Sequence, residues 1–158
     1  MDWAGWATFG FVATVVLTGI MVASQLLGFS RMDLPLMLGT ILVEDPDRAR
    51  IVGFFMHLVN GQLFALLYMA AFALIGFASW WLGALFGLVH GLAALTIIVP
   101  LLPGLHPRMA SERSGPELSA VLEPPGPMAL NYGRQTAVFT IAAHVAYGAI
   151  LGGFLTPR

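Results

Sequence analysis

The sequence contains no cysteine and no lysine, and it has little charge of either sign. Without cysteine the chain cannot form disulfides, thiolate metal sites, iron–sulfur clusters or a cysteine nucleophile. Its seven arginines are balanced by eight acidic residues, for a net charge of −1, so no basic field is available to bind nucleic acid. Only 9% of the residues are charged, whereas soluble domains carry about 25%. The chain therefore lacks the polar surface that a soluble protein needs around its core.

Apolar residues take the place of the missing charge: 58% of the chain is hydrophobic and its mean hydropathy is +0.85. No acidic or basic residue occurs between Arg50 and Arg108, a stretch long enough for two helices of about 20 residues each. Gly76 to Ser79 provide the break between them. We expect a single integral-membrane domain over residues 1–158. It is predicted to be an all-α, four-helix transmembrane bundle with spans at about 3–28, 46–77, 80–102 and 134–155.

The first apolar run is expected to be a retained span and not a secretory signal. Asp2 is its only early charge, so the positive amino-terminal region of a signal peptide is missing. The run from residue 3 to 28 is also longer than the apolar region of a typical signal.

The arginines and the tryptophans predict the orientation of the bundle. The positive-inside rule places loops rich in arginine in the cytoplasm, and tryptophan prefers membrane interfaces. Six arginines fall in the first and third connections: Arg31, Arg48, Arg50, Arg108, Arg113 and Arg134. The tryptophans fall at the opposite ends of the spans: Trp3, Trp6, Trp80 and Trp81. We expect both connections in the cytoplasm and both chain termini outside.

Each cytoplasmic connection has a distinctive composition. Ser30 and Asp33 resemble a capping box before the apolar segment 32–43, whose twelve residues would rise only about 18 Å as a helix. That is too short to cross a bilayer, so an interfacial helix is predicted. Residues 100–133 contain seven of the ten prolines, which excludes a long helix. Apolar residues lie between these prolines, and we expect a folded, proline-rich cytoplasmic cap.

Among the polar residues inside the predicted spans, three histidines, Asn60 and Tyr147 are the candidates for a functional role. His90, His144 and Asn60 each lie about 15 Å from the cytoplasmic end of their helices, and His57 lies about 10 Å from it. Tyr147 follows His144 by one helical turn. Polar groups within a membrane are costly and usually face the bundle interior. The pattern predicts one polar layer in which His57, His90 and His144 are the candidate ligand-binding residues.

Small residues accompany each histidine along its helix. Such stripes occur where transmembrane helices approach closely, so they indicate that the histidines face helix contacts and not lipid. The predicted packing glycines are Gly83, Gly87, Gly91, Gly148 and Gly152.

The polar layer permits several interpretations. In the simplest one, the imidazoles and Asn60 form hydrogen bonds that fix the helix packing. In a second, the histidines bind haem iron or the magnesium of a chlorophyll-type pigment. An ion path and catalysis are disfavoured, because no span contains a carboxylate and no hydrolase elbow or phosphate-binding loop is present. No catalytic residue and no metal site are predicted.

Two charged or titratable features lie outside the spans. Glu44, Asp45 and Asp47 could bind a cation, although helix capping and pairing with nearby arginines explain them more simply. His106 is expected to help fold the cap, with a cytoplasmic ligand site as the alternative.

Five segments resemble a widespread group of small bacterial inner-membrane proteins. These segments cover residues 31–40, 57–61, 87–91, 100–109 and 131–134, and they include the sequences His-Leu-Val-Asn-Gly and Gly-Leu-Val-His-Gly. The resemblance implies a multi-pass, four-helix protein of the bacterial inner membrane. It implies no activity.

The functional expectation is a non-catalytic accessory or scaffold subunit of a larger membrane complex. Its partners would be membrane lipids and other integral membrane proteins or a second copy of the chain. One alternative is a haem- or pigment-binding subunit of an electron-transfer or photosynthetic assembly. A further alternative is a small oligomeric channel.

Overall fold

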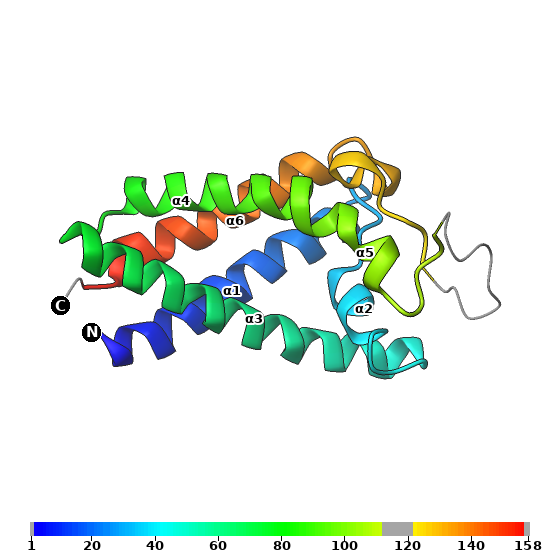
Figure 1. Ribbon diagram of the computed structural model, residues 1–158, viewed down its shortest axis with the longest axis horizontal. Helices are drawn as coiled ribbons and strands as arrows, with labels where there is room; N and C mark the ends of the chain where they lie inside the picture. The colour runs from blue at the N-terminus through cyan, green and yellow to red at the C-terminus, as the bar shows by residue number, and fades with distance from the viewer. Residues whose placement is uncertain (1, 112–121, 157–158) are drawn as a thin grey trace.

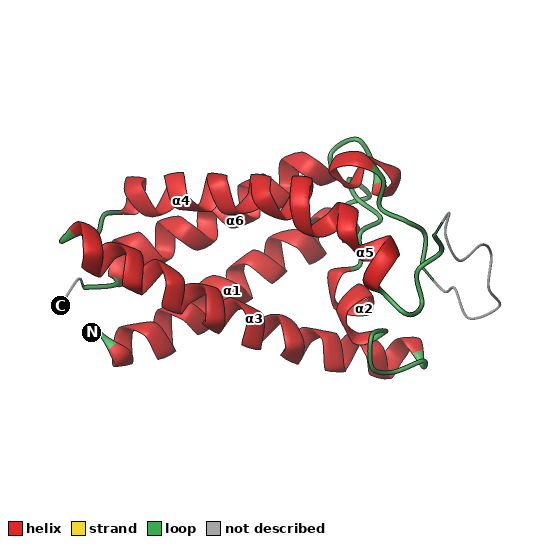
Figure 2. Ribbon diagram, in the orientation of Figure 1, coloured by secondary structure: helices red, strands yellow, loops and turns green. Residues whose placement is uncertain are grey.

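A computed structural model describes residues 2–111 and 122–156, and every regular element in these residues is a helix (Figure 2). Met109 and Leu122 add one isolated bridge between the two described parts of the cap. In chain order, the elements are α1 (Trp3–Leu26), α2 (Leu34–Gly39), α3 (Pro46–Ile75), α4 (Trp80–Ala93), the π-helical η1 (Ala94–Ile98), α5 (Val99–Leu105), the 3₁₀-helical η2 (Pro127–Tyr132) and α6 (Thr136–Phe154).

Four helices are long and apolar enough to cross a membrane, which makes the chain a multi-pass membrane protein. They are α1, α3, the continuous segment Trp80–Leu105 and α6. The second begins with Asp45 as N-cap and Pro46 at its first position, and ends at Gly76, whose φ of 85° favours glycine. The four predicted spans correspond to these helices, with ends that differ by a few residues.

The third helix continues past Pro100 and Pro103 to Leu105, three residues beyond the predicted span. Proline cannot donate a backbone hydrogen bond, and its ring crowds the preceding turn. The helix accommodates this with the wide π turn η1, which comes directly before the first of these prolines. The wider turn keeps the helix continuous where a regular α-helix would break.

Helix α6 packs along α4 and α1, and α1 also packs on α3. Helix α3 ends and α4 begins at the end that holds both chain termini, and the two helices lie farther apart towards the opposite end (Figure 1). The Thr156 hydroxyl donates to the Asp2 carboxylate at 2.8 Å, which ties the two ends of the chain together. The divergence of α3 and α4 creates the space that holds the candidate site.

The close packing of α4 on α6 depends on glycine. A Cβ atom added at Gly83 would overlap the backbone carbonyl of Gly148, and one added at Gly87 would overlap the carbonyl of His144. Gly91 faces the His144 side chain, and Gly152 faces the start of α4. All five predicted packing glycines therefore lie in this one contact, and no side chain larger than hydrogen fits at its centre.

Helix α2 spans Leu34–Gly39, which is shorter than the predicted segment 32–43. Asp33 caps it by accepting from the Leu36 backbone amide at 3.0 Å, so the helix cannot begin earlier. Arg108 donates to the Thr40 carbonyl at 2.6 Å, which helps to end the helix at this point. Gly39 and Gly53 allow α2 to lie directly against α3.

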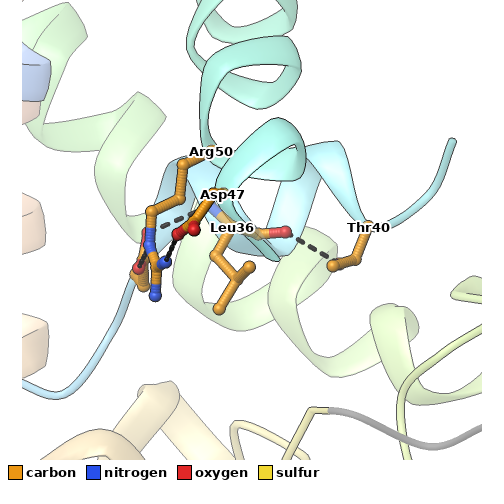
Figure 3. A network of polar contacts seen from close by, with 5 residues as sticks. Leu36, Thr40, Asp47 and Arg50 are labelled. Carbon is orange, nitrogen blue, oxygen red and sulfur yellow. Dashed lines mark hydrogen bonds and ion pairs between the residues drawn. The ribbon is translucent and has the colours of Figure 1, made fainter. Parts of the chain in front are cut away.

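Charged residues fasten α2 to the first turn of α3 (Figure 3). The Arg50 guanidinium lies 2.8 Å from Asp33 and 3.3 Å from Asp47, while the Thr40 hydroxyl donates to the Leu36 carbonyl at 2.7 Å. Both ion pairs are at the surface and each contributes at most about 1 kcal/mol. Their main effect is to hold the helix pair in register beneath the cavity.

The described part of the cap is folded around His106 and Tyr132. His106 is buried; its Nε2 donates to the Met37 carbonyl at 2.8 Å, and its Nδ1 accepts from the Arg108 amide at 3.1 Å. The Tyr132 hydroxyl donates to the Glu123 carbonyl. Burial, reinforced by the charge of Glu123, raises the pKa of Tyr132 to about 12. These bonds attach the cap to α2.

Candidate functional site

A cavity of about 160 Å³ lies inside the bundle, between the diverging helices and above α2. Every predicted ligand-binding histidine contributes to its wall, as do Asn60 and Tyr147. The remaining wall residues come from all four membrane helices and α2: Thr14, Leu17, Met21, Met32, Leu34, Met37, Leu38, Gly61, Phe64, Ala94, Ile98, Val99, Leu102 and Thr140.

His90 and His144 meet across the contact between α4 and α6. Their ring centroids lie 4.7 Å apart and the rings are nearly perpendicular, at 78°. His144 Nδ1 lies 2.8 Å from the Thr140 carbonyl, and a carbonyl can only accept, so this nitrogen carries the proton. The Tyr68 hydroxyl lies 3.4 Å from His90 Nδ1 and supports the second ring.

His57 lines the same cavity from α3 and is held by α1. Its Nδ1 lies 2.8 Å from the Thr18 hydroxyl oxygen, which itself lies 2.8 Å from the Thr14 carbonyl. The Thr18 hydroxyl donates to that carbonyl, which can only accept. In this arrangement, His57 Nδ1 donates to the Thr18 oxygen. In a neutral ring, this leaves Nε2 as an acceptor.

Tyr147 and Asn60 differ in how they are held. The Tyr147 hydroxyl is buried and donates to the Gly61 carbonyl at 2.6 Å, which links α6 to α3. Asn60 lines the cavity but is exposed, and its amide makes no hydrogen bond to any residue in 2–111 or 122–156. The expectation that Asn60 reaches a histidine stays a prediction.

Sequence analysis did not identify the groups that position the histidines. Thr18 and Tyr68 each bond an imidazole through the side-chain hydroxyl, whereas His144 is held by the backbone carbonyl of Thr140. Gln62 was missed as well, although its amide donates to the Ala7 carbonyl at 3.0 Å and joins α3 to α1. The rule that selected Asn60 would have found Gln62. Threonine and tyrosine are too common in membrane helices for that rule to select them.

The cavity has a closed end and an open side. Aromatic rings of α3 and α4 close the end towards the chain termini, where Phe72 and Phe86 stack with centroids 5.5 Å apart and Phe64 lies 4.1 Å from His90. The lining residues Asn60 and Ile98 are both exposed. They stand on α3 and η1, so the cavity, which is only partly enclosed, reaches the outside of the bundle at these two residues.

The site does not suit a metal ion or a large macrocycle. Within 2–111 and 122–156, no three histidine or acidic side chains are grouped closely enough to hold a metal. The contact between His90 and His144 leaves no space for a macrocycle between two axial imidazoles. The cavity volume of about 160 Å³ is close to that of a protein cavity that holds one benzene ring.

Each acidic residue of the cluster in the first connection has its own partner, either an arginine or the first turn of a helix. Glu44 pairs with Arg108 at 2.9 Å, Asp45 caps α3 through the Arg48 amide at 2.9 Å, and Asp47 pairs with Arg50. These carboxylates therefore contribute to the structure of the cap end.

Comparison with known proteins adds no assignment. No protein-family model, curated protein or solved structure matches the chain. Function is therefore argued from the cavity and its side chains.

Proposed function

We propose that this chain is a non-catalytic protein of the bacterial inner membrane that binds a small lipid-soluble molecule within its bundle. The observation that carries the proposal is the cavity wall, where imidazoles from three helices meet an otherwise apolar lining. Small-molecule sites combine mostly apolar walls with a few placed polar groups. Polar side chains are costly to bury in a membrane interior, so they are functional candidates by default.

Binding explains the described residues better than catalysis or conduction. The membrane helices carry no carboxylate beyond Asp47, in the first turn of α3, so none lines the cavity to act as an acid, a base or a proton carrier. The aromatic rings between α3 and α4 close one end of the cavity, so a path through a single bundle has no support. The contact between His90 and His144 argues against haem or chlorophyll-type pigment held between these two rings.

A role as an accessory or scaffold subunit is compatible with ligand binding and remains a proposal. Glycine stripes would support this role if they met another protein, but the glycines of α4 and α6 lie against each other inside the bundle. Another integral membrane protein, or a second copy of the chain, would have to contact a different surface. A Cβ atom added at Gly19 on α1 would have no neighbour within 4 Å, so this glycine marks one such outward face.

The test uses two tryptophan substitutions on η1. Ile98 lines the mouth of the cavity and is 46% exposed, whereas its neighbour Ile97 is 59% exposed and does not line it. Native mass spectrometry of protein purified gently from its membrane should detect a bound small molecule in the unmodified chain and in Ile97→Trp. Ile98→Trp should lose it. Equal occupancy in both variants, or none in the unmodified chain, would contradict the proposal.

A further inference from the structure

The hydrogen-bonding state of the cavity histidines restricts what the site can bind. His57 Nδ1 donates to Thr18 and His144 Nδ1 donates to Thr140, so the protons of both neutral rings are already used. The nitrogen that remains on each ring is Nε2, and it can only accept. Neither Nε2 bonds any residue within 2–111 or 122–156. The site therefore offers two acceptors to its ligand.

The size and the lining of the cavity favour a single aromatic ring. Its volume of about 160 Å³ is comparable to that of a cavity known to hold benzene. Phe64, His90 and His144 provide ring faces and edges, which suit offset or perpendicular aromatic contacts. Met21, Met32 and Met37 line the cavity as well, and thioether sulfur adapts readily to aromatic ligands.

The open side indicates how such a ligand would enter. The exposed lining residues Asn60 and Ile98 stand on two of the helices that are long and apolar enough to cross a membrane. Asn60 stands at this opening with an amide that makes no hydrogen bond to a described residue. The π turn η1 widens the helix at the same point and supplies Ala94 and Ile98 to the wall. A molecule dissolved in the bilayer could place its ring inside and leave an alkyl tail among the lipids.

We propose that the cavity binds a neutral, lipid-soluble phenol, whose ring fills the space between the helices and whose hydroxyl donates to the free imidazole nitrogen of His144 or His57. A hydroxyl donor suits the site because it satisfies an imidazole nitrogen that has a lone pair and no partner among the described residues. This inference rests on the proposed function and names its ligand class.

The experiment compares two ligands that differ by one proton donor. Para-pentylphenol and its methyl ether, para-pentylanisole, have the same ring and tail, but only the phenol can donate a hydrogen bond. Binding of each to the purified full chain in lipid nanodiscs is measured by calorimetry, with empty nanodiscs to subtract partition into lipid. We expect the phenol to bind about tenfold more tightly, the difference that one lost hydrogen bond produces.

Two variants assign the effect to the cavity. His144→Phe keeps a ring at this position and removes the acceptor, so the preference for the phenol should fall by several fold. Ile98→Trp should weaken binding of both compounds, and Ile97→Trp should change neither. If His144→Phe does not fold, the comparison of the phenol with its methyl ether and the two η1 variants still test whether a phenol binds in the cavity.

The outcomes separate the two proposals. A preference for the phenol that is lost in His144→Phe supports both of them. Equal binding of the two compounds, blocked only in Ile98→Trp, would overturn the phenol proposal and leave the proposed function standing. Binding of neither compound, or binding that both η1 variants alter equally, would overturn the phenol proposal. Loss of the co-purifying ligand as well would then overturn the proposed function.

Discussion

At the scale of single residues, the bundle shows how a membrane protein places polar side chains. Thr18, Thr140 and Tyr68 each supply an oxygen to an imidazole, so that no histidine of the cavity lacks a protein hydrogen bond. An unpaired polar group in hydrocarbon would cost several kcal/mol. The same bonds select the proton position on His57 and His144, and so decide which chemical groups the cavity can accept.

The bond between Thr18 and His57 gives a prediction of stability. Thr18→Val keeps the shape of the side chain and removes the hydroxyl, so the His57 ring loses its acceptor. We expect a loss of roughly 0.6 to 1.7 kcal/mol in the free energy of unfolding, the range found for hydrogen bonds between membrane helices. Thr96→Val is the control, because Thr96 is exposed and bonds only the Leu92 carbonyl of its own helix. Equal losses in the two variants, measured by denaturation in detergent, would count against the bond.

A second residue-level prediction concerns Tyr132 in the cap. Its pKa is raised from about 10 to about 12 in the folded chain, mainly by burial. Between these values the unfolded chain loses the proton first, so the stability present below pH 10 is lost as the pH rises towards 12. Tyr132→Phe should make this decline shallower. Thermal unfolding followed from pH 9 to about pH 12 compares the two chains, and identical declines would show that the phenol does not contribute.

At the scale of elements, the contact between α4 and α6 is the part of the fold that tolerates larger side chains least. Gly83 and Gly148 meet backbone to backbone, and Gly87 meets the carbonyl of His144. This contact also sets the distance between His90 and His144, because each histidine stands on one of the two helices. The glycines thus position the site while remaining outside it.

Replacing Gly87 with leucine should force α4 away from α6. We expect a loss of at least about 1 to 3 kcal/mol, the usual cost of inserting methylenes into a packed contact. Gly19→Leu is a matched control, since Gly19 lies in the middle of α1 with no atom within 4 Å of an added Cβ. Denaturation in detergent and elution volume report stability and assembly. Unchanged stability in Gly87→Leu would place this face against lipid.

At the scale of the whole molecule, the two ends of the bundle differ in chemistry. Both chain termini and all four tryptophans lie at one end, whereas α2, the cap and the described arginines lie at the other (Figure 1). The sixth arginine on which the predicted orientation rests, Arg113, lies outside the described residues. This segregation is what an asymmetric membrane requires of a protein with a fixed topology.

The predicted orientation can be tested with reporter fusions. A fusion after Gly133 should report the cytoplasm and a fusion after Arg158 should report the outside, because arginine-rich connections stay on the cytoplasmic side. Alkaline phosphatase, active only outside, and green fluorescent protein, fluorescent only inside, give opposite signals at each position. Phosphatase activity at Gly133 would reverse the orientation.

The sequence by itself determined the fold class and the approximate membrane helices, because a chain with 9% charge and a long uncharged stretch has few ways to satisfy its backbone in lipid. It also identified the three histidines, since polar residues stand out against apolar spans. Only the tertiary structure decided which atoms are available to a ligand. The proton positions on His57 and His144 depend on α1 and on the α6 backbone, and the cavity depends on the divergence of α3 and α4. The bond from His144 to Thr140 is local to α6, but the bond from His57 to Thr18 and the walls of the cavity join residues distant along the chain, which no local pattern could reveal.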